Sequence, residues 1–172
     1  MSNKYENLKF IYLFFFIIFC NNLSSQSIDP NLKTKGYFSI AHPILTSDAN
    51  GIVYNFDHQY TVAFPMGINI LKNNNLAFSF EFAPTIKSVG GITKETNFLF
   101  HPGIIFRRPH NFNFLTRAAF ETSGRFGCTF VFNKVFFKTN NYSYWAAIPV
   151  PFRFGNNAPA SVGIGLQFGF TF

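Results

Sequence analysis

Large apolar side chains occupy every second position along most of this chain. The segment Ser161–Phe172 shows the pattern clearly, with an apolar residue at each even position and Gly163, Gly165, Gln167, Gly169 and Thr171 between them. Side chains on a β-strand point alternately to opposite faces. The segment is therefore predicted to be a strand with one apolar face and one slim or polar face.

The same period recurs in earlier segments, which gives eight predicted strands and no segment with helical period. They cover residues 37–45, 52–70, 76–83, 98–107, 112–121, 126–138, 144–154 and 161–172. Residues 52–70 keep one phase over nineteen positions, whereas a transmembrane strand needs only 9 to 11. This second strand is therefore predicted to run unbroken and to project beyond a membrane.

The connections between the predicted strands fall into two groups. Lys72–Asn75, Arg108–Asn111 and Thr139–Asn141 are short and rich in Asn, while Thr46–Gly51 and Ser88–Glu95 are predicted to be longer loops. Bacterial barrels have short periplasmic turns and longer outer loops. If both chain ends face the periplasm, the three short turns lie on that side. The connection Gly155–Ala160 resembles the short turns but falls on the outer side.

Residues 125–138 fit the pattern least well. Lys134 falls on the parity that faces outward, where a charge in the middle of a bilayer would cost about 2–4 kcal/mol. Three interpretations are open: Lys134 lies at an interface, a bulge shifts the phase of the strand, or residues 125–141 form an outer loop.

Composition favours a membrane environment over an aqueous one. Aromatic residues make up 20 % of the chain, 27 residues are Phe, and only 12 % are charged, about half the share of a typical soluble domain. In hydrocarbon every backbone polar group must be paired internally, which a closed sheet achieves. The formal net charge of +7 is spread along the sequence and suits a barrel rim near anionic head groups. It forms no basic run, so nucleic-acid binding is not expected.

The amino-terminal segment has the features of a secretory signal peptide. Lys4 and Lys9 precede an eleven-residue apolar run, Phe10–Cys20, which is too short for a membrane-spanning helix. We predict a signal peptide over residues 1–25, a polar leader over 26–35 and an all-β, antiparallel up-and-down transmembrane barrel over 36–172. With Cys20 removed, Cys128 would have no partner for an intramolecular disulfide.

The chain resembles the small, eight-stranded outer-membrane β-barrel proteins of double-membraned bacteria. The resemblance rests on the leader, the Phe-rich alternating strands, the Asn-rich turns and the ending G-L-Q-F-G-F-T-F. The resemblance implies a location in the cell outer membrane, contact with its lipid, and recognition of the final strand by the barrel-assembly machinery. Phe168, Phe170 and Phe172 would carry that assembly signal.

The inward parity holds the candidate functional residues. Eight strands leave an interior just wide enough to be filled by side chains. Glu81, His101 and Arg117 fall near the middle of three consecutive strands, and Glu121 and Arg153 fall nearer the outer end. Because unpaired buried charges are costly, these five residues are predicted to form a polar network that fills the lumen. A proton path or small-ligand site around His101 is the competing interpretation.

The sequence supports no catalytic, cofactor or metal site. None of the four histidines has a nucleophile on its own face in a motif that would activate it, and no His, Cys or Asp cluster has metal-ligand spacing. We expect a barrel with a structural or surface-interaction role in the cell envelope, with a possible extracellular ligand at the outer loops. The alternatives are a narrow pore or small-ligand transporter, a lipid-modifying barrel enzyme, and a secreted soluble β-sandwich binding module.

Overall fold

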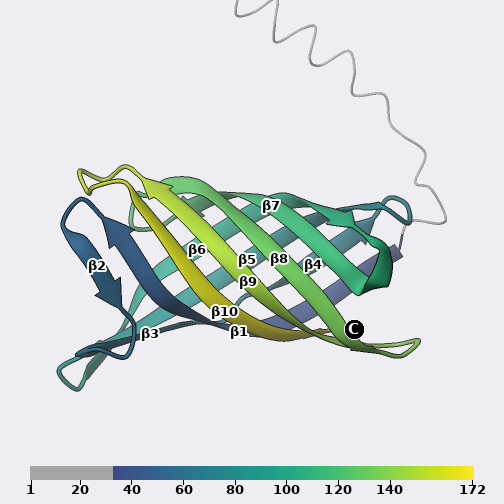
Figure 1. Cartoon of the computed structure of the whole chain (residues 1–172), viewed down its shortest axis with the longest axis horizontal. Helices are drawn as coiled ribbons and strands as arrows, with labels where there is room; N and C mark the ends of the chain where they lie inside the picture. Colours follow the sequence, from purple (N-terminus) through teal and green to yellow (C-terminus); the bar gives the residue numbers. More distant parts are fainter. Residues whose placement is uncertain (1–32) are drawn as a thin grey trace, which may run out of the picture. The chain divides into compact units, whose positions relative to one another are not determined.

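The computed structural model describes residues 33–172, which form a single all-β unit (Figure 1). The predicted signal peptide, and the predicted leader up to residue 32, lie outside the described residues. The strands are β1 (Lys33–Asp48), β2 (Gly51–Tyr54), β3 (Gln59–Ala63), β4 (Met66–Leu71), β5 (Leu76–Val89), β6 (Ile92–Arg107), β7 (Phe112–Glu121), β8 (Phe126–Lys138), β9 (Ser143–Phe154) and β10 (Ser161–Thr171), with one 3-10 turn, η1 (Pro109–Asn111). Within this range no helix is long and apolar enough to cross a bilayer.

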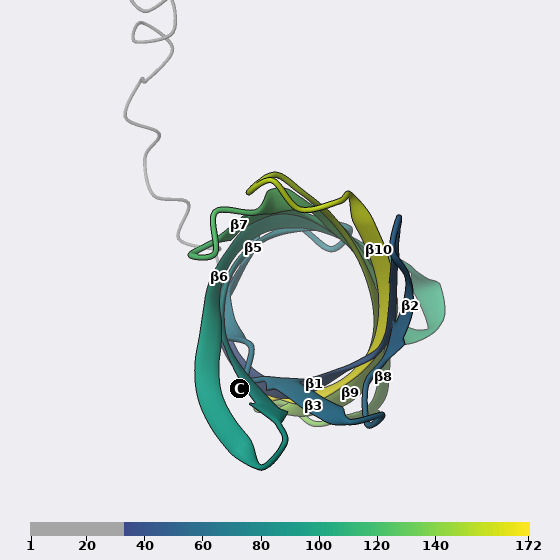
Figure 2. The ribbon, with the colours of Figure 1, turned by 90° about the vertical axis from the view of Figure 1, so that its left-hand side faces the viewer.

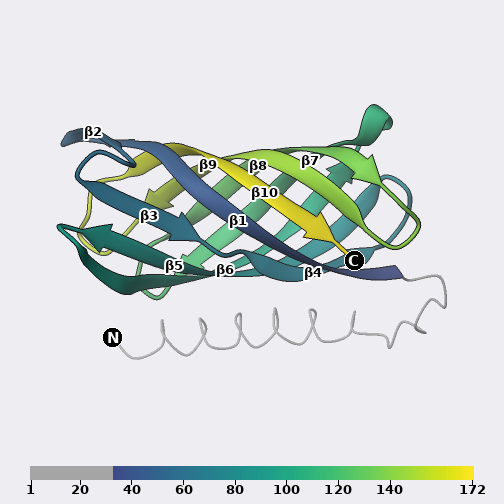
Figure 3. The same cartoon turned by 90° about the horizontal axis from the view of Figure 1, so that it is seen from below.

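The strands close into an antiparallel ring, which Figure 2 shows along its axis. Each strand from β5 to β10 pairs with the next one along the chain, and β10 returns to pair with β1. The segments β3 and β4 together take the second place, between β1 and β5, so the ring has eight strands, and β2 pairs with the end of β1 alone. Figure 3 shows β3 and β4 between β1 and β5. The predicted up-and-down barrel is confirmed. The sandwich alternative is wrong, because two packed sheets would not join β1 to β10.

The second strand is broken, contrary to the prediction of one strand over residues 52–70. It is interrupted at residues 55–58, where Phe56 and His58 have positive φ angles of 73° and 56°. A second interruption follows β3 at Pro65, which has no N–H to donate to a ladder. The carbonyl of Pro65 instead accepts hydrogen bonds from the Ser39 amide at 2.8 Å and from the Ser39 hydroxyl at 3.0 Å.

The predicted long loop over Ser88–Glu95 is also wrong. β5 continues to Val89 and β6 begins at Ile92, with only Gly90 and Gly91 between them. Their φ angles of 57° and 80° are the left-handed values that a two-residue hairpin turn requires. The other predicted long loop shortens in the same way, since β1 ends at Asp48 and β2 begins at Gly51.

Residues 125–138 include a full strand, so the outer-loop interpretation of this stretch is wrong. β8 pairs with β7 on one side and β9 on the other. Lys134 lies at the end of the ring, where its Nζ donates to the His110 carbonyl at 2.6 Å and sits 3.9 Å from the Phe112 ring centre. A register shift between Val135 and Phe137 marks a bulge just beyond it. Lys134 itself keeps its outward parity, so its position at the end of the ring, and not the bulge, accounts for the charge there.

Inward and outward faces follow the predicted parity in most strands. Outward positions carry half-exposed apolar residues, such as Phe80 at 39 % and Phe168 at 54 %, while the inward neighbours Ser79 and Glu81 are 0 % and 2 % exposed. Outward rings stack between strands, as in the Phe82–Phe100 and Phe114–Phe130 pairs. The barrel thus has an apolar, aromatic exterior. Its interior combines polar side chains such as Ser79 and Glu81 with an apolar cluster that includes Ile105 and Leu115.

Candidate functional site

Glu81 lies at the centre of the lumen. Its Oε2 accepts hydrogen bonds from the Tyr37 hydroxyl and from Nη1 of Arg117, both at 2.9 Å, and its Oε1 lies 2.9 Å from Nδ1 of His101. The three partners come from β1, β7 and β6, and all are buried. A carboxylate on β5 therefore joins four strands across the barrel interior.

The partners of His101 fix its tautomer. Arg153 approaches Nε2 with an Nη2 donor at 3.2 Å, and a guanidinium can only donate. Nε2 is therefore the acceptor nitrogen, and the proton sits on Nδ1, where it is donated to Glu81. In this arrangement the ring is neutral, and it links Glu81 to Arg153.

Arg153 connects the central group to Glu121. Its Nε donates to Oε1 of Glu121 at 2.6 Å, and its Nη1 donates to the Thr129 hydroxyl and the Cys128 carbonyl. The network thus holds two carboxylates and two guanidiniums around a neutral imidazole, and its formal charges cancel. Opposite signs meet at both ion pairs, which reduces the cost of burial.

Small residues make room for this network. A Cβ added to Gly67 would collide with the Phe80 carbonyl and lie 2.9 Å from the Tyr37 hydroxyl, and one added to Gly103 would collide with the Arg117 side chain. Buried Ser79 accepts a further hydrogen bond from Arg117 at 3.2 Å. On the far side of Tyr37, the indole of Trp145 packs edge-on at 6.2 Å and donates to the Thr171 hydroxyl at 3.0 Å.

The structure brings all five predicted lumen residues into one connected group. Sequence reasoning did not anticipate the contributions of Tyr37, Ser79 and Thr129, which lie on the inward parity but are not ionised residues. The signal was present, because each is a polar residue at an inward position of a strand. Parity predicts only that these side chains point inward, whereas the pairing register of the strands determines which of them meet.

One part of the network has the connectivity of a nucleophile, a base and an acid. The Thr129 hydroxyl lies 3.1 Å from Nε2 of His101, whose Nδ1 faces Glu81. Such a relay needs an accessible nucleophile, but Thr129 is 3 % exposed and also accepts from Arg153. Arg153 occupies the nitrogen that would take the hydroxyl proton. The geometry therefore serves packing and charge pairing better than acyl transfer.

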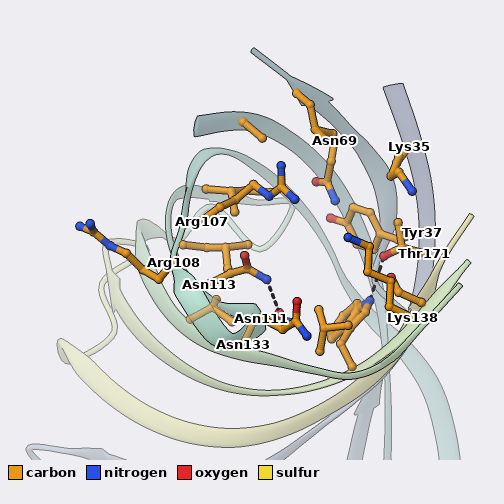
Figure 4. A pocket seen from close by; sticks show the side chains of 18 of the residues that line it. Lys35, Tyr37, Asn69, Arg107, Arg108, Asn111, Asn113, Asn133, Lys138 and Thr171 are labelled. Atoms are coloured by element: carbon orange, nitrogen blue, oxygen red, sulfur yellow. Dashed lines mark hydrogen bonds between the residues drawn. The ribbon is translucent and has the colours of Figure 1, made fainter. Parts of the chain in front are cut away.

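A cavity of about 540 Å³ lies between this network and one end of the barrel (Figure 4). That end carries Lys33 and the turns after β4, β6 and β8, and is called the terminus end below; the opposite end is the hairpin end. Arg117, Tyr37 and Gln167 belong to its lining, which does not include His101 or Thr129. The wall combines apolar residues such as Ile105 and Leu115 with asparagines and with the cations Lys33, Lys35, Arg107, Arg108 and Lys138.

Phe168, Phe170 and Phe172 lie outward at the terminus end, with exposed fractions of 54 %, 39 % and 61 %. Phe170 contacts Phe38, Tyr144 and Phe172 at ring-centre distances of 5.8–6.3 Å. This placement fits an outward aromatic girdle, and their role as an assembly signal stays a prediction.

Comparison with known proteins finds likeness only at the level of shape. No protein-family model matches the sequence, and no curated protein matches it significantly. Two solved structures match. The solution NMR structure of the de novo designed TMB2.3 has 10 % identity and a TM-score of 0.44 and covers 82 % of this chain and 97 % of its own. A structure titled "De novo design of transmembrane beta-barrels" has 11 % identity and a TM-score of 0.38, with 79 % and 94 % covered.

Proposed function

We propose that this protein is an outer-membrane β-barrel of the cell envelope, with a lumen closed by side chains and a structural or surface-interaction role. The observation that carries the proposal is the outward belt of Phe, Ile, Leu and Val around the ring. An exposed apolar surface that extends around a whole barrel is far larger than the patches of soluble proteins. Ring closure pairs the backbone groups that a lipid environment would leave unsatisfied.

The interior supports a closed barrel rather than a narrow pore or a small-ligand transporter. The side chains of Glu81, His101, Arg117 and Arg153 meet across the middle of the lumen, and all four are less than 9 % exposed. An ion crossing this layer would have to break two ion pairs in a low-dielectric surrounding. The network acts as a fixed plug.

The hairpin end supports the surface-interaction role. Every residue of β2 is exposed, and among the described strands β2 pairs with β1 alone, so its other edge is free. Phe56 is 62 % exposed, and its ring lies 5.5 Å from that of Tyr60 and 6.1 Å from that of His42, tilted by 40° to each. An exposed aromatic cluster beside a free strand edge is suited to contact with an extracellular ligand or surface.

Two experiments test this function. The full chain is expressed in a double-membraned bacterium, its outer-membrane fraction is isolated, and its migration is compared with and without boiling. Recovery in the soluble fraction would contradict the membrane proposal. The purified barrel is then reconstituted in planar bilayers, where no unit conductance is expected. Stable conductance comparable with that of a general porin would disprove the plug.

The triple variant Glu81→Ala/Arg117→Ala/Arg153→Ala is the positive control for conductance, because it removes the long side chains of the plug. Incubation of the wild-type barrel with phospholipid or lipopolysaccharide tests the alternative of a lipid-modifying enzyme. No turnover is expected, and product formation would reverse that assignment.

A further inference from the structure

The net positive charge of the described chain is collected at one end of the barrel. Seven cations lie at the terminus end: Lys33, Lys35, Lys72, Arg107, Arg108, Lys134 and Lys138. No acidic residue of residues 33–172 lies there. In the rest of that range, five cations are balanced by five Asp and Glu residues. The charge that looks dispersed in the sequence is therefore concentrated in space.

Five of these cations line the terminus-end cavity. Figure 4 shows Arg107 and Lys35 directed toward the space they share, Lys138 beside Thr171, and Arg108 at the rim, directed away from it. None of the five side chains forms an ion pair or hydrogen bond with another described side chain. By contrast, both lumen arginines farther inside, Arg117 and Arg153, have a carboxylate partner. Within residues 33–172, the plug has counter-charges and the cavity has none.

The bulge in β8 contributes directly to this cluster. By simple alternation Lys138 would share the outward parity of Lys134. The register shift between Val135 and Phe137 instead places Lys138 opposite Ser143, which also lines the cavity. A bulge is a common means of redirecting a side chain. Here it adds a cation to the inner wall.

The cavity also contains polar groups with no protein partner. Nε of Arg117, on a side chain that is 5 % exposed, and Oδ1 of Asn69 are buried atoms without a hydrogen bond. Both residues line the cavity. Opposite them, Asn113 donates to Asn133 at 2.8 Å. Unsatisfied buried donors and acceptors are rare in folded proteins. These two atoms are enclosed by protein, and Nε of Arg125, which does not line the cavity, is a third of the same kind.

We propose that the terminus-end cavity binds a small, multivalent phosphate-bearing molecule. Lys35 and Arg107 are half-buried in the cavity wall, and Lys33, Arg108 and Lys138 are exposed at its rim. Unpaired cations placed around one opening focus a positive potential on the space between them. A guanidinium such as Arg107 matches phosphate oxygens in a fork, and lysines add point charges. A single carboxylate would neutralise only a small part of this charge. The volume, about 540 Å³, lies within the range of small-ligand pockets and leaves room for a phosphorylated sugar, whose hydroxyls the asparagine amides would contact.

Inorganic pyrophosphate is the first probe. The full barrel, folded in maltoside detergent to avoid phosphate head groups, is titrated by calorimetry at constant ionic strength. Lys35→Gln/Arg107→Gln is expected to weaken binding at least tenfold. The matched control Lys87→Gln/Lys94→Gln removes the same charge from a cross-strand pair near the hairpin end and is expected to change affinity less than twofold. Lys138→Gln, a substitution at an exposed residue of the rim, should weaken binding severalfold.

Each variant is first checked for heat-modifiable migration, so that loss of binding is read only from folded protein. Absence of pyrophosphate binding, or equal weakening by both double variants, would overturn the proposal. Equal binding of citrate would overturn the preference for phosphate. Two further titrations identify the source of the bound phosphate group. Tighter binding of a sugar phosphate would indicate a solute, and saturation of the site by phosphatidylglycerol added to the micelles would indicate a lipid head group. These measurements do not depend on the conductance result.

Discussion

The ion pair between Glu81 and Arg117 provides the most direct test of the lumen network. Glu81→Gln keeps the shape of the side chain but removes the charge that faces Arg117 at 2.9 Å. Both side chains are at most 5 % exposed, so water is a poor replacement for the lost partner. Breaking a buried pair from one side typically costs about 3–5 kcal/mol. We expect a loss in the lower half of this range, because the amide oxygen can still accept from His101.

The assay is equilibrium urea unfolding in lipid vesicles, followed by tryptophan fluorescence. Trp145 is the single tryptophan of the sequence, and its ring packs on Tyr37, which donates to Glu81. The signal therefore reports on the network itself. Asp57→Asn makes the same chemical change at a side chain that is 68 % exposed and should alter the unfolding free energy by less than about 0.5 kcal/mol.

A double-mutant cycle separates pairing from general damage. Arg117→Met alone leaves Glu81 without its cation, while Glu81→Gln/Arg117→Met removes both charges. The double variant should be more stable than the sum of the single effects predicts, by at least about 1 kcal/mol. An additive result, or a Glu81→Gln effect no larger than that of Asp57→Asn, would refute the dry, paired lumen described above.

Three further predictions follow from the exterior, the interior and the turns. Phe80→Arg, on the outward face in the middle of the wall, should lower the unfolding free energy in vesicles by about 2–4 kcal/mol, and Phe136→Arg near the terminus end by about 1 kcal/mol or less. Equal losses in urea titrations would contradict the membrane placement. Gly67→Ala should lower the unfolding free energy by about 1–3 kcal/mol, because the added Cβ collides with the Phe80 carbonyl. Gly163→Ala, whose added Cβ would lie 3.1 Å from its nearest neighbour, should lower it less in the same titration. Gly90→Asn should leave stability nearly unchanged, since Asn tolerates the φ angle of 57°, while Gly90→Val should lower it by about 1 kcal/mol or more; equal behaviour of the two variants would count against the two-residue turn.

Much of the fold was predictable because alternation has a period of two and a closed barrel has only two faces. The parity of Glu81, His101 and Arg117 places them inward, and an interior just wide enough to be filled by side chains brings them into contact. The break at Pro65 and the tight turn at Gly90–Gly91 were signalled by residue type. In both cases the local residue type, and not the longer alternation pattern, determines the structure.

The terminus-end cavity was not predictable in the same way. Lys33 and Lys35 fall in the predicted polar leader, yet β1 begins at Lys33 and pairs with β4 there. Lys138 faces the cavity only because of the bulge after Val135. Register and bulges are set by contacts between strands distant in sequence, which a single sequence does not display.

The uneven charge of the barrel gives its insertion a direction. Both ends carry a similar number of charges, seven cations at the terminus end against three cations and three acidic residues at the hairpin end outside the plug, so the cost of moving charges through hydrocarbon does not distinguish them. The two ends differ in net charge, which is positive at the terminus end and zero at the hairpin end. In the membrane placement proposed above, anionic head groups attract the terminus end alone. Protein added to preformed anionic vesicles is therefore expected to take one preferred orientation, with Lys33 and the turn at Arg108 held at the outer surface, where added protease would cleave.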